Sequence, residues 1–164
     1  MRATYDEIAS YLANLAELME RHGILLRPSV DGEDLIIGET ADGSLSFELL
    51  GDLPHGVEPA SRISVREAFA HVAPGRYERS RYEYELLDVA RDYRRAFHLH
   101  SPDWFERTHL VVVHEHCERP IGRVDCEHFE GTPIKDGYAG IGVLMTAWTG
   151  APPDCSTLPC LDHG

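Results

Sequence analysis

Tyr93–His100 reads YRRAFHLH and Leu110–His116 reads LVVVHEH, so each of these two segments ends in a His-x-His pair. The first segment alternates in polarity and the second is rich in valine, and both patterns are typical of β-strands. Successive side chains of a strand point to opposite faces, so each pair projects both imidazoles from one face. The short connection favours neighbouring antiparallel strands. The sequence therefore predicts an antiparallel sheet on which four imidazoles converge.

The region from His98 to His128 contains six of the ten histidines of the chain. Neutral imidazole is the commonest side-chain metal ligand, and its proton equilibrium lies near physiological pH. Removing several imidazoles from water without a partner is costly, which favours a functional site over unrelated core residues. We predict that zinc, manganese or iron binds at a site formed by these residues: His98, His100, His114, His116 and His128.

Three kinds of chemistry could use this set of residues. In the first, the histidines and a carboxylate from Glu115, Glu118 or Asp125 bind a metal ion that activates water. In the second, a histidine pair acts as general acid and base, while Arg94 or Arg95 stabilises an anion without a metal. In the third, the histidines only order a loop. The residues that we expect to act in catalysis are His98, His100, Arg94 and Glu115.

Further elements are indicated on the N-terminal side of this region. A capping box, Thr4-x-x-Glu7, opens a helix that ends near Gly23. Residues 35–39 and 44–50 predict a β-hairpin. Glycine and proline mark residues 51–63 as a loop, and we expect a boundary there between an acidic part and a His-rich part of one domain, 1–164. The apolar side chains that the helix should pack on the sheet are Ile8, Leu12, Leu15 and Met19.

The remaining patterns complete the expected fold. A second capping box, Ser64-x-x-Glu67, predicts a short middle helix that continues to about Val72. Residues 82–86 alternate like a half-buried strand, and a turn at 88–92 leads into the strand that carries His98. A C-terminal helix is expected over 138–148, followed by an irregular tail at 150–164. Together these elements predict an α+β fold, with a mainly antiparallel sheet and three helices packed on it.

The composition indicates one globular domain with an acidic balance. The chain has 164 residues, of which 43% are hydrophobic and 26% charged, and a net charge of −13. No apolar run approaches the ~20 residues that span a bilayer. The first residues carry acids where a signal peptide has an apolar core, so we expect a cytoplasmic protein that does not enter a membrane. Phosphate backbones repel carboxylates, and this charge therefore disfavours generic nucleic-acid binding.

The charges are distributed unevenly along the chain. Residues 1–60 hold three arginines and twelve acids, whereas residues 61–100 hold eight arginines and six acids. This asymmetry predicts a carboxylate surface and a small basic cleft near the histidines. Alternatively, the arginines pair locally with the acids of the same hairpin. The arginines concerned are Arg76, Arg79, Arg81, Arg91, Arg94 and Arg95.

The four cysteines all lie in the last third of the chain, at positions 117, 126, 155 and 160. An intracellular protein usually keeps its thiols reduced, so we expect unpaired cysteines. A structural zinc site is the weaker alternative, because there is no Cys-x-x-Cys motif and the Cys155-x4-Cys160 spacing is loose for zinc.

Part of the chain resembles a known family. Tyr82-x-Tyr84-x-Leu86-x-Asp88, then Arg94-Arg95-x-Phe97-His98-x-His100, a second His-x-His strand, a Gly-Thr-Pro turn and a closing helix resemble the small TumE-like proteins of bacterial toxin–antitoxin pairs. The resemblance covers residues 80–148. It implies a compact toxin that acts on RNA, with histidine and arginine in its site and a cognate protein partner. The N-terminal 75 residues have no counterpart in that family, and the net charge is unusual for an RNA-cutting toxin.

Two functional hypotheses follow from the sequence. In the leading one, a small protein binds a divalent metal on its His-rich sheet face and hydrolyses a phosphodiester. In the alternative, the chain is a non-catalytic interaction module whose histidines are structural. Its acidic surface then binds a basic protein or mimics nucleic acid.

Overall fold

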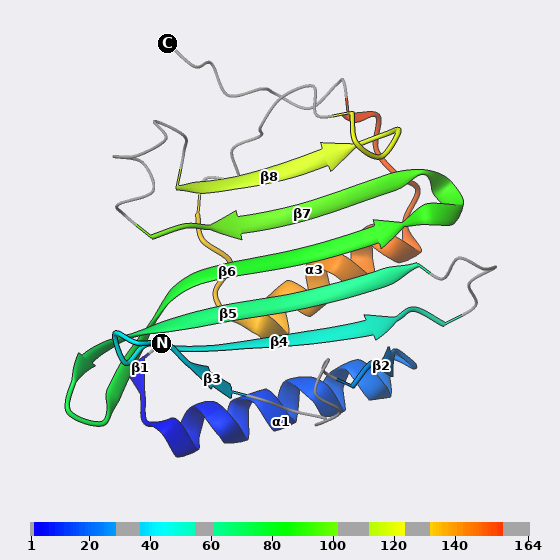
Figure 1. Ribbon diagram of the computed structural model, residues 1–164. Helices are drawn as coiled ribbons and strands as arrows, with labels where there is room; N and C mark the ends of the chain where they lie inside the picture. The colour runs from blue at the N-terminus through cyan, green and yellow to red at the C-terminus, as the bar shows by residue number, and fades with distance from the viewer. Residues whose placement is uncertain (1, 29–36, 55–60, 102–111, 124–131, 156–164) are drawn as a thin grey trace, which may run out of the picture.

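The computed structural model describes residues 2–28, 37–54, 61–101, 112–123 and 132–155. Within these residues the chain forms one antiparallel sheet of eight strands and two α-helices, so the α+β class is confirmed (Figure 1). No helix in the described part of the chain is long and apolar enough to span a bilayer. The elements are β1 (Arg2–Ala3), α1 (Tyr5–Arg21), β2 (Leu25–Leu26), β3 (Ile37–Glu39), β4 (Leu45–Asp52), β5 (Arg62–Ala73), β6 (Arg76–Asp88), the 3-10 helix η1 (Val89–Arg91), β7 (Tyr93–Leu99), β8 (Val113–Glu118) and α3 (Gly137–Thr149).

The sheet follows the order β2-β4-β5-β6-β7-β8, with β1 paired to β6 and β3 paired to β4. Strands β4 to β8 follow one another in the chain and also lie side by side. The loop after β4 therefore joins neighbouring strands, and Gly51 pairs with Ile63 and Asp52 with Arg62 across it. The hairpin expected over 35–39 and 44–50 is present as β3 and β4, with Ile37 opposite Phe47.

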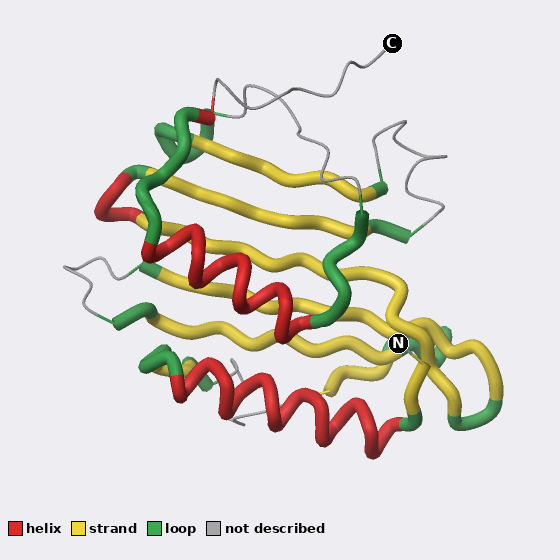
Figure 2. The backbone as a smooth tube through the Cα atoms, turned by 180° about the vertical axis from the view of Figure 1, so that it is seen from behind, coloured by secondary structure: helices red, strands yellow, loops and turns green. Residues whose placement is uncertain are grey.

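Both helices pack on the same face of the sheet, which we call the helix face (Figure 2). The capping box of α1 forms as predicted, because Glu7 N–H donates to Thr4 Oγ1 and Thr4 N–H donates to the Glu7 carboxylate. Figure 2 shows α3 lying across the middle of the sheet. Gly140 permits this approach, since a Cβ there would lie 2.6 Å from the Tyr84 ring. The predicted apolar side of α1 is buried: Ile8, Leu12, Leu15 and Met19.

The expected middle helix at residues 64–72 was wrong, because this segment belongs to strand β5. The capping residues are used for long-range contacts. Ser64 Oγ donates to Glu48 at 3.3 Å. Glu67 accepts hydrogen bonds from Tyr11, Arg79 and Tyr84. Pairing with β4 on one side and β6 on the other satisfies the backbone of this β-branched segment, and this tertiary context outweighs the local helix signal.

The expectation of unpaired cysteines was also wrong. Cys117 and Cys155 form a disulfide with 5.4 Å between their Cα atoms. Alternation along β8 directs Cys117 to the helix face, where the segment after α3 brings Cys155 to it. The two residues are 38 positions apart, so their spacing gave no sign of this contact. The pairing also excludes Cys155 from the alternative zinc site. Cys126 and Cys160 lie outside the described residues.

Candidate metal centre

The second face of the sheet, which we call the histidine face, carries a compact group of imidazoles. His98, His114 and His116 each offer one ring nitrogen, and these three nitrogens all lie within 4.8 Å of one another. The closest pair is His114 Nε2 and His116 Nε2, at 3.1 Å. A tetrahedral ion with bonds of ~2.0–2.1 Å separates its ligand atoms by about 3.3 Å. The three histidines therefore form a cluster of the right size for a small divalent ion.

The sheet register brings the three rings together. His98 on β7 lies directly opposite His114 on β8, and their ring centroids are 5.1 Å apart. His116 lies opposite Ala96, whose small side chain leaves room for the imidazole to approach His98. The centroids of His98 and His116 are 4.9 Å apart. The prediction that at least three of the four imidazoles meet in one cluster is confirmed.

Burial keeps His98 in the protonation state that metal binding needs. Desolvation, followed by the neighbouring His116 and His114, lowers the pKa of His98 to about 2. The ring is therefore neutral at pH 7, and a neutral imidazole has a lone pair for a metal. Its buried Nε2 has no hydrogen-bond partner among the described residues. A buried nitrogen in this state is costly unless a ligand engages it.

His100 borders the cluster but is not one of the three possible ligands. It follows the end of β7, and its backbone N–H donates to the carbonyl of Val112 at 2.9 Å. Its ring stacks on His114, with centroids 5.0 Å apart. Desolvation and the neighbouring His114 lower the pKa of His100 to about 4. His128, the fifth predicted ligand, lies outside the described residues.

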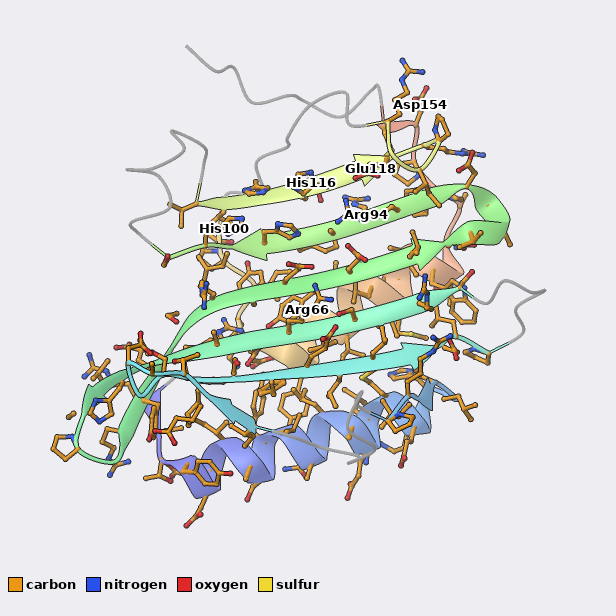
Figure 3. All side chains as sticks on the ribbon, in the orientation of Figure 1. Arg66, Arg94, His100, His116, Glu118 and Asp154 are labelled. Carbon is orange, nitrogen blue, oxygen red and sulfur yellow. A yellow bond between two sulfur atoms is a disulfide. The ribbon has the colours of Figure 1, made fainter. Side chains whose placement is uncertain are left out.

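The predicted catalytic arginine and carboxylate lie in different places. Arg94 is on the histidine face, where it contacts Glu85 at 2.8 Å and also Glu118 (Figure 3). Glu115, in contrast, points to the helix face and pairs with Arg95 at 2.7 Å. Adjacent residues of a strand face opposite ways, so Glu115 cannot share a site with its neighbours His114 and His116. The structure therefore brings Arg94 near the histidines and keeps Glu115 away from them.

Five of the six arginines that the sequence grouped near the histidines form ion pairs, but only Arg91–Asp88 and Arg94–Glu85 lie within the same hairpin. Arg79 pairs with Glu67, Arg91 with Asp88 and Arg95 with Glu115. Arg76 lies 3.8 Å from Glu7. Of the six, only Arg81 has no ion pair with another described residue. Ion pairing of these arginines is therefore more extensive than the prediction of a small basic cleft implied, and most of it extends beyond the hairpin.

Sequence reasoning missed one part of the histidine face. Arg66 extends between Glu48 and Glu83, with an N–O distance of 2.7 Å to each. Glu83 lies opposite His98 in the register, so this charged row adjoins the imidazoles. The alternation of Glu83 and Glu85 with buried tyrosine and leucine was the available signal. It did not identify the neighbouring strand, because residues 64–72 were expected to form a helix.

Comparison of the chain with protein-family models, with curated proteins and with solved structures gave no match. The chemistry of the histidine cluster is therefore the basis for a functional proposal.

Proposed function

We propose that this protein is a divalent-metal-dependent hydrolase in which His98, His114 and His116 bind the metal ion. The observation that carries this proposal is the mutual approach of three ring nitrogens to within 4.8 Å. Sites with three protein ligands leave a fourth position for water, and a bound zinc ion lowers the pKa of that water to about 7. An all-imidazole ligand set suits zinc, and manganese or iron are the alternatives to be compared.

The pKa values favour this chemistry over a metal-free histidine pair. A general acid must hold a proton near neutral pH. Burial lowers the pKa of His98 to about 2 and that of His100 to about 4, so neither ring is protonated at pH 7. Of the two arginines that could stabilise an anion in the metal-free alternative, Arg94 pairs with Glu85 and Glu118, and Arg95 pairs with Glu115. Activation of water by a metal requires neither a protonated histidine nor a free Arg94.

A phosphodiester is the proposed substrate class, and the resemblance of residues 80–148 to the TumE-like proteins supports this choice. A metal ion held by His98, His114 and His116 would activate a water molecule for attack on phosphorus. The water oxygen would form the new bond to phosphorus and release its proton to solvent, and the bond from phosphorus to one ester oxygen would break. The departing alkoxide takes up a proton from solvent and leaves as an alcohol. One phosphodiester and one water thus give one phosphomonoester and one alcohol.

Elemental analysis of untagged protein tests metal binding directly. We expect close to one metal ion per chain after dialysis against zinc, manganese or ferrous iron under anaerobic conditions. The variants His114→Asn and His116→Asn should each lose the ion. His71→Asn is the matched control, because His71 is exposed on β5 and contacts only the Tyr77 ring among the described side chains. It should retain the metal.

Hydrolysis of bis(p-nitrophenyl) phosphate tests the reaction. We expect turnover by the metal-loaded protein, loss of turnover with EDTA, and recovery when the metal is returned. A wild-type protein that binds no metal under these conditions contradicts the proposal and favours the interaction-module hypothesis. A protein that binds the metal but hydrolyses no phosphodiester retains the metal site and contradicts the hydrolase assignment.

A further inference from the structure

A cavity of about 550 Å³ lies on the histidine face beside the imidazoles. Its walls come from β4, β5, β6 and the end of β7, and His100 belongs both to its wall and to the group of contacting rings. This volume lies within the range of small-molecule sites. The side chains that carry its chemistry are Ser46, Glu48, Arg66, Arg81, Glu83 and His100.

The two arginines of this cavity differ in their ion pairs. Arg66 pairs with both Glu48 and Glu83, so its guanidinium is engaged by two carboxylates. Arg81 is exposed and forms no ion pair with any described residue. Tyr82 lies opposite Leu99 in the register, which places Arg81 next to His100 at the end of the cavity nearest the imidazoles. The cavity therefore offers, close to the proposed metal site, one guanidinium that has no ion pair among the described residues.

We infer that this cavity binds a small phosphodiester of mononucleotide size and that Arg81 binds its anionic phosphate group. This inference rests on the proposed hydrolase function and names its substrate class. A guanidinium binds phosphate oxygens through two parallel N–H donors, which would hold the phosphate at the His100 end of the cavity. The carboxylates of Glu48 and Glu83 also line the cavity, and they repel the additional phosphates of a long strand. The net charge of −13 likewise repels a long nucleic-acid strand.

Kinetics of an Arg81→Gln variant test the role of this residue. With metal-loaded protein and the p-nitrophenyl ester of thymidine 5′-phosphate, KM should rise about 10- to 100-fold, the expected effect of losing a charge-assisted hydrogen bond. Arg81→Lys should recover part of this loss, and inorganic phosphate should inhibit wild type more strongly than Arg81→Gln. Arg76→Gln is the matched control, since Arg76 lies on the same strand but outside the cavity. Its KM should equal that of wild type.

The outcomes separate this inference from the proposed function. Arg81→Gln should keep its metal content, because Arg81 is not one of the three ligands. A retained metal with an unchanged KM overturns the role of Arg81 and leaves the hydrolase proposal standing. Faster cleavage of a 20-nucleotide RNA than of the mononucleotide ester, at equal concentration of phosphodiester bonds, overturns the small-substrate assignment. A wild-type protein that binds no metal overturns both proposals together.

Discussion

The buried polar groups of the helix face and those of the histidine cluster have different kinds of neighbours. On the helix face, the Glu67 carboxylate accepts hydrogen bonds from Tyr11, Arg79 and Tyr84. Arg95 and Glu115 form a further complementary pair there. On the histidine face, three side chains of the same kind meet, and the buried Nε2 of His98 has no hydrogen-bond partner among the described residues. Groups of opposite charge, or a donor and an acceptor, stabilise each other within the protein. A cluster of neutral imidazoles is stabilised further by a bound ligand such as a metal ion.

The same contrast between ion pairs and clustered imidazoles is found within strand β8. On β8, Glu118 pairs with Arg94, while His116, two residues earlier on the same face, packs against the rings of His98 and His114 (Figure 3). Charged pairs at one end of the strand therefore contribute to the fold. The imidazoles at the other end of β8 lie where a metal ion could bind between them. The comparison predicts that substitutions on the helix face reduce stability, whereas those in the histidine cluster reduce metal binding.

The largest expected effect lies on the helix face, in the variant Glu67→Ala. This change removes the acceptor of three hydrogen bonds and leaves Arg79, whose side chain is 7% exposed, without its carboxylate. Breaking a buried ion pair on one side costs about 3–5 kcal/mol in the free energy of unfolding. Urea unfolding at pH 7.5 measures this loss of stability. Arg66→Ala is the control on the histidine face, because its exposed pairs contribute less than about 1 kcal/mol. Equal losses of stability in the two variants would contradict this difference between the helix face and the histidine face.

A smaller effect is expected from acidification of the metal-free protein. The pKa of His98 is about 2 in the folded state, below the value of about 6.5 for an unfolded chain. Below pH 6.5 the unfolded state therefore binds more protons, and folded-state stability falls as the pH falls. Between pH 6.5 and 5 this group alone should lower the free energy of unfolding by about 2 kcal/mol. Urea unfolding in EDTA at several pH values measures the slope. A flat profile over this window contradicts the burial of neutral His98.

The smallest change in stability is expected for His98→Leu. His98 is half-buried, and its buried Nε2 has no hydrogen-bond partner among the described residues. Replacing such a group by an apolar one of similar size is nearly neutral or stabilising, so the free energy of unfolding at pH 7.5 without metal should change by less than about 1 kcal/mol. The same variant should lose the metal and the part of the stability slope between pH 6.5 and 5 that His98 contributes, whereas His100, whose pKa is lowered to about 4, should keep its own part. A large loss of stability in the metal-free protein would assign His98 a structural role instead.

Local patterns predicted most of the elements correctly. The capping box at Thr4 and the apolar spacing that follows it specify α1, because both are satisfied within one or two turns of the same helix. Strand alternation correctly separated the histidine side of β7 from its core side, where Tyr93 and Phe97 are buried. The same rule already placed Glu115 on the face opposite His114. Its assignment to the site depended on its proximity in sequence and ignored this rule.

Residues 64–72 are a segment for which the local sequence pattern predicted the wrong secondary structure. Ser64 and Glu67 match a helix-start motif, but Ser64 donates to Glu48 and Glu67 accepts from Tyr11, a residue 56 positions away. A local motif contributes about 1 kcal/mol, whereas residues 64–69 pair with β4 on one side and β6 on the other, and the following residues continue the pairing with β6. The charged row of Arg66 and the cavity beside His100 exist only because this segment is a strand.

Taken alone, the sequence determined the periodic features: the amphipathic α1, the strand alternation that puts each His-x-His pair on one face, and the α+β class. These depend on interactions between residues a few positions apart, which the order of residues displays directly. Only the tertiary structure decided that residues 64–72 form a strand, that Cys117 meets Cys155, and that His98 lies opposite His114. Such contacts join distant parts of the chain, and their selection depends on the packing of the whole sheet and both helices.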